Sequence, residues 1–124
     1  MNIEANSTPS IHGDGVRIAQ VFENLFTNAI KYAPTAPITV TLASKGETVM
    51  VVFKDGGPGI APESLPLIFE RFYRVKSEKS VTGSGLGLYI CKQIIMAHHG
   101  NIWVESTLDR GTTFFIEFPA DPVV

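Results

Sequence analysis

The sequence has one cysteine, no excess of basic charge and no long hydrophobic run. The single cysteine, Cys91, excludes an internal disulfide framework and a cysteine-rich zinc site, and it is typical of a reducing compartment. Ten lysines and arginines stand against twelve acidic residues, so no basic field attracts nucleic acid or an anionic membrane. No apolar run approaches the ~20 residues of a membrane span, and residues 1–10 are not a signal peptide. We therefore expect a cytoplasmic protein without nucleic-acid or direct membrane contact.

What is present is the size of one packed domain and an uneven distribution of glycine. The 124 residues fit a single domain, and a hydrophobic fraction of 44% is too high for a disordered chain. Six of the eleven glycines fall in two clusters, at residues 56–59 and 83–87. Glycine weakens helices and strands, so such clusters indicate backbone shapes that other residues cannot adopt. Two ordinary surface turns are the alternative interpretation.

Hydrophobic periodicity predicts an order of elements and therefore a fold class. After a loop-like start, the pattern predicts a helix from a cap at Asp14 to Tyr32, strands at 38–42 and 49–53, and a short helical piece at 63–69. A second helix follows from the second glycine cluster to about residue 99, then strands at 102–106 and 112–118. This order predicts an α+β, two-layer sandwich in which helices cover one face of a mixed, mostly antiparallel sheet. Expected core residues are the second-helix face of Leu86, Ile90, Ile94 and Ala97, the small Cys91, and the aromatics Trp103, Phe114, Phe115 and Phe118.

The first predicted helix carries a polar stripe beside its apolar one. Asn24, Asn28 and Lys31 project within roughly 60° of one another on a helix. An asparagine carbonyl is a neutral hard-oxygen ligand suited to Mg²⁺, and a lysine supplies a point charge for phosphate oxygens. A solvated surface is the alternative. The neighbouring apolar stripe consists of Ile18, Val21, Phe22, Leu25 and Ala29.

The two glycine clusters match neither common nucleotide fingerprint. The P-loop ending is absent, and Leu88 stands where the dinucleotide pattern needs its third glycine. A glycine-rich approach to a helix N-terminus still suits an anionic ligand. At the other cluster Asp55 ends an apolar strand, and a carboxylate that only accepts hydrogen bonds favours the amine of adenine over the carbonyl of guanine. Gly57 and Gly59 would let a flat ring approach the backbone, although an Asp-initiated turn without a ligand fits as well.

Four blocks in order resemble a known family. Residues 24–32 (NLFTNAIKY), 55–60 (DGGPGI), 68–74 (IFERFYR) and 83–88 (GSGLGL) resemble the N, G1, F and G2 boxes of the catalytic and ATP-binding domain of sensor histidine kinases. That domain belongs to the Bergerat-fold ATPases, with gyrase, Hsp90 and MutL. The resemblance covers about residues 13–119, so residues 1–124 are interpreted as one such domain, a fragment of a larger kinase. It also implies a mobile ATP lid at about residues 61–83.

The resemblance implies a site for ATP and Mg²⁺. Asn28 would coordinate the metal close to Asn24, Asp55 would accept from the adenine amine, and either Thr112 or Thr113 would lie near the base. Residues implied in phosphoryl transfer are Asn24, Lys31, Arg71 and Arg74, of which Arg71 or Arg74 would reach the γ-phosphate. Residues implied in ATP binding are Asn24, Asn28, Lys31, Tyr32, Asp55, Gly57, Gly59, Ile60, Phe69, Phe72, Gly83, Ser84, Gly85, Leu86, Gly87, Leu88, Thr112 and Thr113. Among these, Phe69 and Phe72 would anchor the lid.

The implied activity is transfer of the γ-phosphate to a histidine rather than hydrolysis. Hydrolysing relatives place a glutamate where this chain has Asn24, and the nearby acid Glu23 lies ~100° away around the helix. His12, His98 and His99 do not resemble an acceptor site. The acceptor would therefore belong to a histidine-bearing dimerisation domain of the same kinase, with a response regulator downstream and a monomeric isolated domain. The alternatives are a Bergerat-fold ATP hydrolase, a nucleotide-binding regulatory module without transfer, and a protein-serine kinase.

Overall fold

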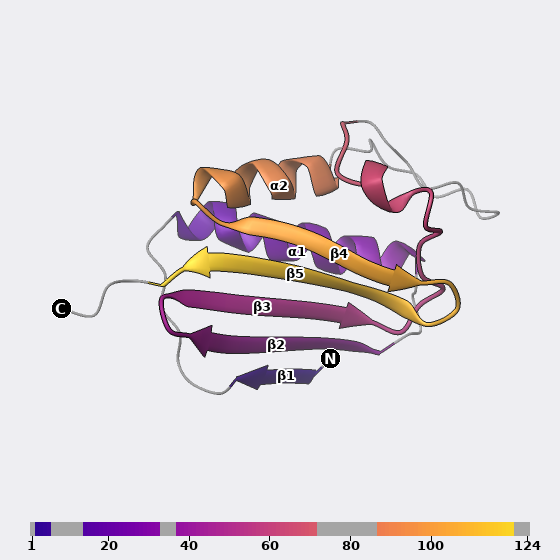
Figure 1. The fold of residues 1–124 in the computed structure, drawn as a ribbon, viewed down its shortest axis with the longest axis horizontal. Coiled ribbons are helices and arrows are strands. Elements are labelled where there is room, and N and C mark those ends of the chain that lie inside the picture. Colours follow the sequence, from indigo (N-terminus) through magenta and orange to yellow (C-terminus); the bar gives the residue numbers. More distant parts are fainter. Residues whose placement is uncertain (1, 6–13, 33–36, 72–86, 121–124) are drawn as a thin grey trace.

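The computed structural model describes residues 2–5, 14–32, 37–71 and 87–120, and its elements form two layers (Figure 1). Five strands form one sheet in the order β1-β2-β3-β5-β4, in which β1 pairs with β2 in parallel and the other pairs are antiparallel. Helices α1 and α2 lie together on one face of the sheet. The predicted α+β sandwich is therefore confirmed. The elements are β1 (Asn2–Ala5), α1 (Gly15–Tyr32), β2 (Ile38–Lys45), β3 (Thr48–Asp55), the 3₁₀ helix η1 (Leu65–Leu67), α2 (Gly87–Ala97), β4 (Asn101–Thr107) and β5 (Gly111–Pro119).

Helix α1 begins and packs as its sequence pattern predicts. The Asp14 carboxylate accepts hydrogen bonds from the backbone N–H groups of Val16 and Arg17, at 3.0 and 3.3 Å. These N–H groups have no partner inside the helix, so the cap satisfies them. The apolar stripe faces the sheet, with Val21, Leu25 and Ala29 buried. This packing leaves the neighbouring polar stripe at the margin of the helix layer.

The imidazole of His98 connects the start of α1 with the end of α2. Its Nε2 lies 2.9 Å from the Asp14 backbone nitrogen, and its Nδ1 lies 2.8 Å from the Ile94 carbonyl oxygen. Since a backbone nitrogen donates and a carbonyl accepts, both contacts are satisfied by the tautomer protonated at Nδ1. One side chain thus links the start of α1 to the end of α2, and His98 has a structural role.

Strand β3 shows the alternation expected of a sheet with one buried face. On β3, Val49, Val51, Phe53 and Asp55 are buried, whereas the residues between them are partly or fully exposed. The β2–β3 turn lies at Gly46, whose φ of 60° favours glycine. The predicted strands are confirmed and run one to three residues further at their ends. The core facing the helices consists of Val21, Leu25, Ala29, Val40, Val51, Phe53, Ile68, Cys91, Ile94, Ile95, Ile102, Phe114, Ile116 and Phe118.

The buried face of α2 agrees with the prediction at Cys91 and Ile94 and differs from it elsewhere. Cys91, Ile94 and Ile95 are buried, whereas Ile90 is only partly covered and Ala97 is exposed. Leu86 lies outside the described residues. The helix is apolar on nearly all sides, so its periodicity does not single out one face, and packing against α1 decides which side is buried.

The loop-like start predicted for the chain contains a strand. Asn2–Ala5 pair in parallel with residues 39–42 at the edge of the sheet. Four residues carry too little periodicity to predict a strand, because a parallel edge strand is specified by the neighbour on which it docks. The strand covers the edge of β2.

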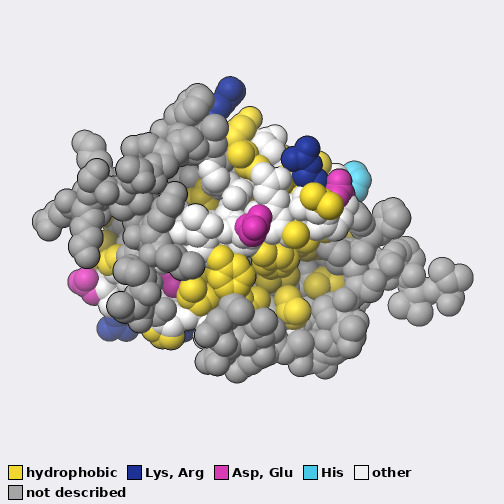
Figure 2. All heavy atoms as spheres, turned by 180° about the vertical axis from the view of Figure 1, so that it is seen from behind, with side chains coloured by type: hydrophobic (Ala, Val, Ile, Leu, Met, Phe, Trp, Pro, Cys, Tyr) yellow, Lys and Arg dark blue, Asp and Glu magenta, His cyan; other side chains and the backbone are white. Residues whose placement is uncertain are grey.

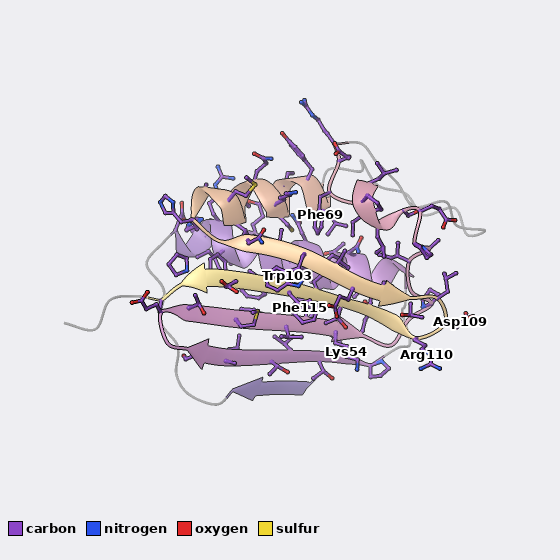
Figure 3. The ribbon with its side chains drawn as sticks, in the orientation of Figure 1. Lys54, Phe69, Trp103, Asp109, Arg110 and Phe115 are labelled. Atoms are coloured by element: carbon purple, nitrogen blue, oxygen red, sulfur yellow. The ribbon has the colours of Figure 1, made fainter. Side chains whose placement is uncertain are left out.

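The face of the sheet opposite the helices carries two aromatic rings that were expected in the core. Trp103 of β4 and Phe115 of β5 stack with centroids 5.4 Å apart and an interplanar angle of 7° (Figure 3). Both are only partly buried, because odd positions on β5 point away from the helices, whereas Phe114 and Phe118 are in the core as predicted.

Seen from the helix side, hydrophobic side chains gather in the middle and lysines and arginines lie toward the margin (Figure 2). Among the described residues, no helix combines the length and hydrophobicity needed to span a membrane.

Candidate nucleotide-binding site

Two buried polar side chains lie next to each other where β3 ends. Asp55 is the last residue of β3, and Thr112 is its direct partner in the register with β5. Directly opposed residues project to the same face of a sheet, so both side chains lie on the helix-covered face. They are 8% and 6% exposed, whereas Thr113 pairs with Lys54 and therefore lies on the opposite face. Of the two candidate threonines, Thr112 is the one beside Asp55.

The loop that follows Asp55 is held by the carboxylate itself. The Gly57 N–H donates to Asp55 Oδ1 at 2.9 Å, and the Gly56 N–H donates to the Pro37 carbonyl at 3.2 Å. A carboxylate that accepts from the backbone two residues on forms an Asx-type turn. Asp55 can therefore both initiate the turn and bind a ligand. A carboxylate that accepts from its own loop still has lone pairs with which to accept a further hydrogen bond.

The turn between β4 and β5 packs directly on this loop. The Asp109 N–H donates to the Pro58 carbonyl at 2.7 Å (Figure 3). A Cβ at Gly59, where φ is 79°, would lie 2.3 Å from the Thr107 carbonyl oxygen, and one at Gly111, where φ is 98°, would lie 2.2 Å from the Asp55 carbonyl oxygen. The packing of the turn thus requires glycine at position 59, and the expected approach of a flat ring to its backbone stays a prediction. Two chain segments about fifty positions apart form one rigid unit here.

The hydroxyl of Ser106 lies at the centre of that unit. It accepts from the Ile60 N–H at 2.7 Å and lies 2.9 Å from the Gly111 carbonyl oxygen and 3.0 Å from Thr112 Oγ1. The sequence pattern did not identify this residue as part of a site, because it predicts only that Ser106 belongs to the strand at 102–106. No local signal could have found it, because its partners are five, six and forty-six positions away. The Ile60 side chain itself packs against the core.

The asparagines of α1 lie on the side of the helix that is next to α2. Asn24 donates from Nδ2 to the carbonyl of Gly87, the first residue of α2, at 3.4 Å, and Asn28 follows one turn later, also half-buried. The side chains of Lys31 and Tyr32 lie outside the described part of the structure. Within the described residues no group of three His, Cys, Asp or Glu could hold a metal. A divalent cation here would therefore depend on neutral oxygen ligands such as Asn28 and on phosphates, a donor set that suits Mg²⁺.

The first part of the expected lid belongs to the packed body of the domain. Ile68 is in the core, and the Phe69 ring meets the Phe114 ring edge-on with centroids 6.3 Å apart. The Lys92 ammonium lies 5.5 Å from the Phe69 ring centroid, and the Arg71 guanidinium lies 5.4 Å from that of Tyr89. The Phe69 ring thus packs residues 68–71 against the sheet and α2, whereas its role as an anchor of an ATP lid stays a prediction. Expected site residues that fall outside the described residues are Phe72, Arg74, Gly83, Ser84, Gly85 and Leu86.

Two further expected ATP-binding residues form the first turn of α2. Gly87 is exposed and is the first helical residue, whereas the Leu88 side chain packs against the core. Gly87 can therefore present only backbone to a ligand, and the backbone N–H groups of a helix start suit an anion. On the next turn, burial raises the pKa of the Cys91 thiol from 9.0 to about 11, although a hydrogen bond with Asn24 acts in the opposite direction.

Comparison with known proteins identifies the family of this chain. The family described as "Histidine kinase-, DNA gyrase B-, and HSP90-like ATPase" matches residues 13–122. The chain is 42% identical over 113 residues to the adaptive-response sensory kinase SasA of Gloeothece citriformis, covering 90% of this chain and 29% of that protein. The chain therefore belongs to the family of histidine kinase-, gyrase B- and Hsp90-like ATPases. It spans less than a third of the length of curated relatives such as SasA.

Solved structures of similar sequence have the same fold. The mycobacterial sensor histidine kinase MprB superposes with a TM-score of 0.85 at 34% identity, over 98% of this chain and 85% of that one. Full-length ShkA in complex with AMPPNP superposes with a TM-score of 0.81 at 30% identity, over 98% of this chain and 26% of that one. The described elements thus have the architecture of histidine kinase catalytic domains. Membership of this ATPase family identifies the chain as an ATP-binding domain of the histidine kinase type.

Proposed function

We propose that this domain binds Mg-ATP and transfers the γ-phosphoryl group to a histidine on a separate dimerisation domain. The observation that carries the proposal is the buried pair of Asp55 and Thr112 at the end of β3, beside a loop held rigid by the β4–β5 turn. A carboxylate there accepts from the exocyclic amine of adenine, directly and through water. The helix-covered face would thus hold the base.

The triphosphate would extend from the base toward the facing parts of α1 and α2. Asn28 would ligate Mg²⁺, which supplies charge neutralisation on the phosphates, and Lys31 would contact phosphate oxygens. The glycine cluster that ends at Gly87 would surround the phosphates with backbone N–H groups at the start of α2. Arg71 or Arg74 would reach the γ-phosphate, and the Arg71 guanidinium lies 5.4 Å from the Tyr89 ring centroid, close to the start of α2.

Transfer fits this site better than hydrolysis. The position that would carry a water-activating glutamate is Asn24, and its amide donates to the Gly87 carbonyl. The neighbouring Glu23 is exposed on the outer side of α1. A neutral imidazole has a free lone pair and needs less help from a base than water does, so catalysis would consist mainly of positioning and charge neutralisation.

The parent protein that this proposal implies has more parts than this chain. A dimerisation domain would present the acceptor histidine, and a response regulator would receive the phosphoryl group. The domain itself would be monomeric and cytoplasmic, would not contact the membrane directly and would bind no nucleic acid. The similarity to SasA, which is named as a sensory kinase and of which this chain covers 29%, supports this assignment.

The binding step is tested by calorimetric titration of the domain with ATP and with GTP in the presence of Mg²⁺. We expect ATP to bind with a free energy of about 5–8 kcal/mol, GTP to bind much more weakly, and Asp55→Asn to weaken ATP binding by at least about tenfold. Asp109→Asn is the matched control, because it makes the same change at an exposed position of the adjoining turn. A folded protein that binds no ATP would contradict the proposal.

The transfer step is tested by adding a histidine-bearing dimerisation domain from a homologous kinase together with γ-labelled ATP. We expect an acid-labile phosphohistidine on the added domain, and Asn28→Ala should abolish its formation because the metal ligand is lost. Phosphate release without an acceptor, at a rate abolished by Glu23→Gln, would support the hydrolase alternative. Tight ATP binding without transfer to any supplied domain would support a regulatory module.

A further inference from the structure

We propose that Ser106 is a specificity-determining positioning residue, which fixes the direction of the Thr112 hydroxyl hydrogen and so makes the base-binding edge of the site a pure acceptor. The inference rests on the proposed function, in which Asp55 and Thr112 meet the base, and it adds a residue that the four sequence boxes do not include. Ser106 itself would touch no ligand. Its effect would be transmitted through Thr112 alone.

The Ser106 hydroxyl oxygen lies within hydrogen-bond distance of three groups, and its donors and acceptors can be assigned to them. A serine hydroxyl has one hydrogen to donate and two lone pairs with which to accept. The Ile60 N–H occupies one lone pair, at 2.7 Å, because a backbone nitrogen can only donate. Two contacts remain, to the Gly111 carbonyl oxygen at 2.9 Å and to Thr112 Oγ1 at 3.0 Å. One hydrogen and one lone pair are left to serve them.

Only one assignment satisfies both remaining contacts. The Gly111 carbonyl can only accept, so Ser106 must donate its hydrogen to that oxygen. Thr112 must then donate its own hydroxyl hydrogen to the second lone pair of Ser106. The opposite assignment, with Ser106 donating to Thr112, would leave two oxygen atoms 2.9 Å apart without a hydrogen between them, which is unfavourable for buried polar groups.

The direction of that one hydrogen decides what Thr112 can offer to a ligand. With its hydrogen turned toward Ser106, Thr112 presents only lone pairs to the site. Asp55, its neighbour across the β3–β5 pair, also presents only lone pairs. The edge therefore suits a base with an amine at this position, or a water that donates to both side chains. A base with a carbonyl at this position would face acceptors only, and no threonine hydrogen could turn to meet it.

The surrounding backbone keeps this arrangement from adjusting. The Asp109 N–H holds the loop at Pro58, and the Gly111 backbone approaches Asp55 so closely that a Cβ would lie 2.2 Å from the Asp55 carbonyl oxygen. Both the donor and the carbonyl acceptor of Ser106 are thus main-chain groups in fixed positions. The hydroxyl of Ser106 cannot be reoriented without breaking one of these contacts.

The test compares nucleotides that differ only at the relevant edge of the base. ATP has an amine at position 6, whereas inosine triphosphate has a carbonyl there and otherwise the same sugar and phosphates. We would measure both dissociation constants by calorimetry for the wild type, Ser106→Ala, Ser106→Thr and Thr107→Ala. Ser106→Thr keeps the hydroxyl, and Thr107→Ala removes an exposed hydroxyl from the adjacent position of the same strand. Circular dichroism would establish that each variant is folded.

We expect the wild type to prefer ATP, and Ser106→Ala to reduce the ratio of the two dissociation constants by about five- to tenfold, because Thr112 regains a hydrogen that it can donate to a carbonyl. Ser106→Thr and Thr107→Ala should keep the wild-type ratio. In a Thr112→Val background, Ser106→Ala should no longer change the ratio, because the hydroxyl through which it acts is gone.

The outcomes separate this inference from the proposed function. Equal weakening of both nucleotides by Ser106→Ala, with an unchanged ratio, would overturn the inference and leave Ser106 a purely structural residue. An effect that persists in the Thr112→Val background would overturn it as well. A wild type that binds neither nucleotide would overturn the proposed function itself, and the inference with it. If Ser106→Ala does not fold, Ser106→Cys takes its place, and its weaker hydrogen bonds should lower the ratio part of the way.

Discussion

Cys91 is the residue whose chemistry the fold changes most. Its thiol lies between α1 and α2, with no exposed surface, and donates weakly to the Val21 carbonyl at 3.6 Å. A thiolate there would lose its hydration, which is why burial raises the pKa from 9.0 to about 11. Since the thiolate is the reactive form of cysteine, Cys91 is inert at neutral pH and serves as a small core residue, as the sequence predicts.

Stability should fall at alkaline pH because of this thiol. Between pH 9 and about 11 the folded protein keeps the Cys91 proton while the unfolded chain loses it, so the folded state binds more protons. The free energy of unfolding should then decrease as pH rises through this window, by up to about 1.4 kcal/mol per pH unit, with little effect below about pH 8. Urea unfolding at pH 8, 9 and 10 would measure the slope. Cys91→Ala should flatten it, and equal slopes in both proteins would contradict the assignment.

The elements that form the site are held together by backbone contacts as well as by side chains. The β4–β5 turn touches the loop after β3 through the Asp109 N–H and the Thr107 carbonyl. Such contacts leave no room for a side chain at Gly59, whose positive φ adds a second requirement for glycine. The position of the loop is therefore set by a turn that follows it by about fifty residues.

Gly59→Ala should be strongly destabilising, and Gly46→Ala provides a matched control. Both glycines have a positive φ, of 79° and 60°, but a Cβ at Gly59 would lie 2.3 Å from a carbonyl oxygen, whereas nothing lies within 4 Å of one at Gly46. We expect Gly46→Ala to cost about 1 kcal/mol, the penalty of left-handed backbone alone, and Gly59→Ala to cost more than about 3 kcal/mol. Urea denaturation measures both. Equal losses would mean that the turn does not press on the loop.

How much of this could be predicted from the sequence depended on whether the signal was local. The cap at Asp14, the helix that follows it and the antiparallel hairpins were all predicted, because periodicity and turn residues specify them locally. The strand Asn2–Ala5 was not predicted, and the buried face of α2 was predicted only in part, because docking on other elements decides both. The sequence predicted that Asp55 and one of two threonines lie near the same ligand. The register of β3 with β5 then identified Thr112, and not Thr113, as the neighbour of Asp55. Ser106 was not predicted, because its hydrogen-bond partners lie on other segments of the chain and leave no pattern in the local sequence.

At the scale of the whole molecule, the sheet has one edge covered by a short strand and one face on which none of the described helices lies (Figure 1). β1 pairs with β2 through four residues and covers the edge that β2 would otherwise expose. Exposed strand edges invite pairing with other chains, so a short edge strand helps to keep a domain monomeric. The candidate site lies on β3 and β5, which do not contact β1 in the sheet.

Deletion of residues 1–5 should therefore separate stability from function. We expect the midpoint of thermal unfolding to fall by roughly 5 °C, because only a short edge strand is lost. ATP affinity should stay within about twofold, and the exposed β2 edge should make the domain self-associate as concentration rises. Circular dichroism, calorimetry and analytical ultracentrifugation measure these three quantities. Loss of ATP binding in the folded, shortened protein would show that β1 supports the site after all.

The stack of Trp103 on Phe115 gives the domain an intrinsic optical probe. Trp103 is the single tryptophan of the chain, and its ring lies on the face of the sheet opposite Asp55 and Thr112. Its fluorescence therefore reports whether β4 and β5 are paired, and a nucleotide at the candidate site would not contact it. The same sample can thus report unfolding through tryptophan emission and ligand binding through heat, without a label and without one signal contaminating the other.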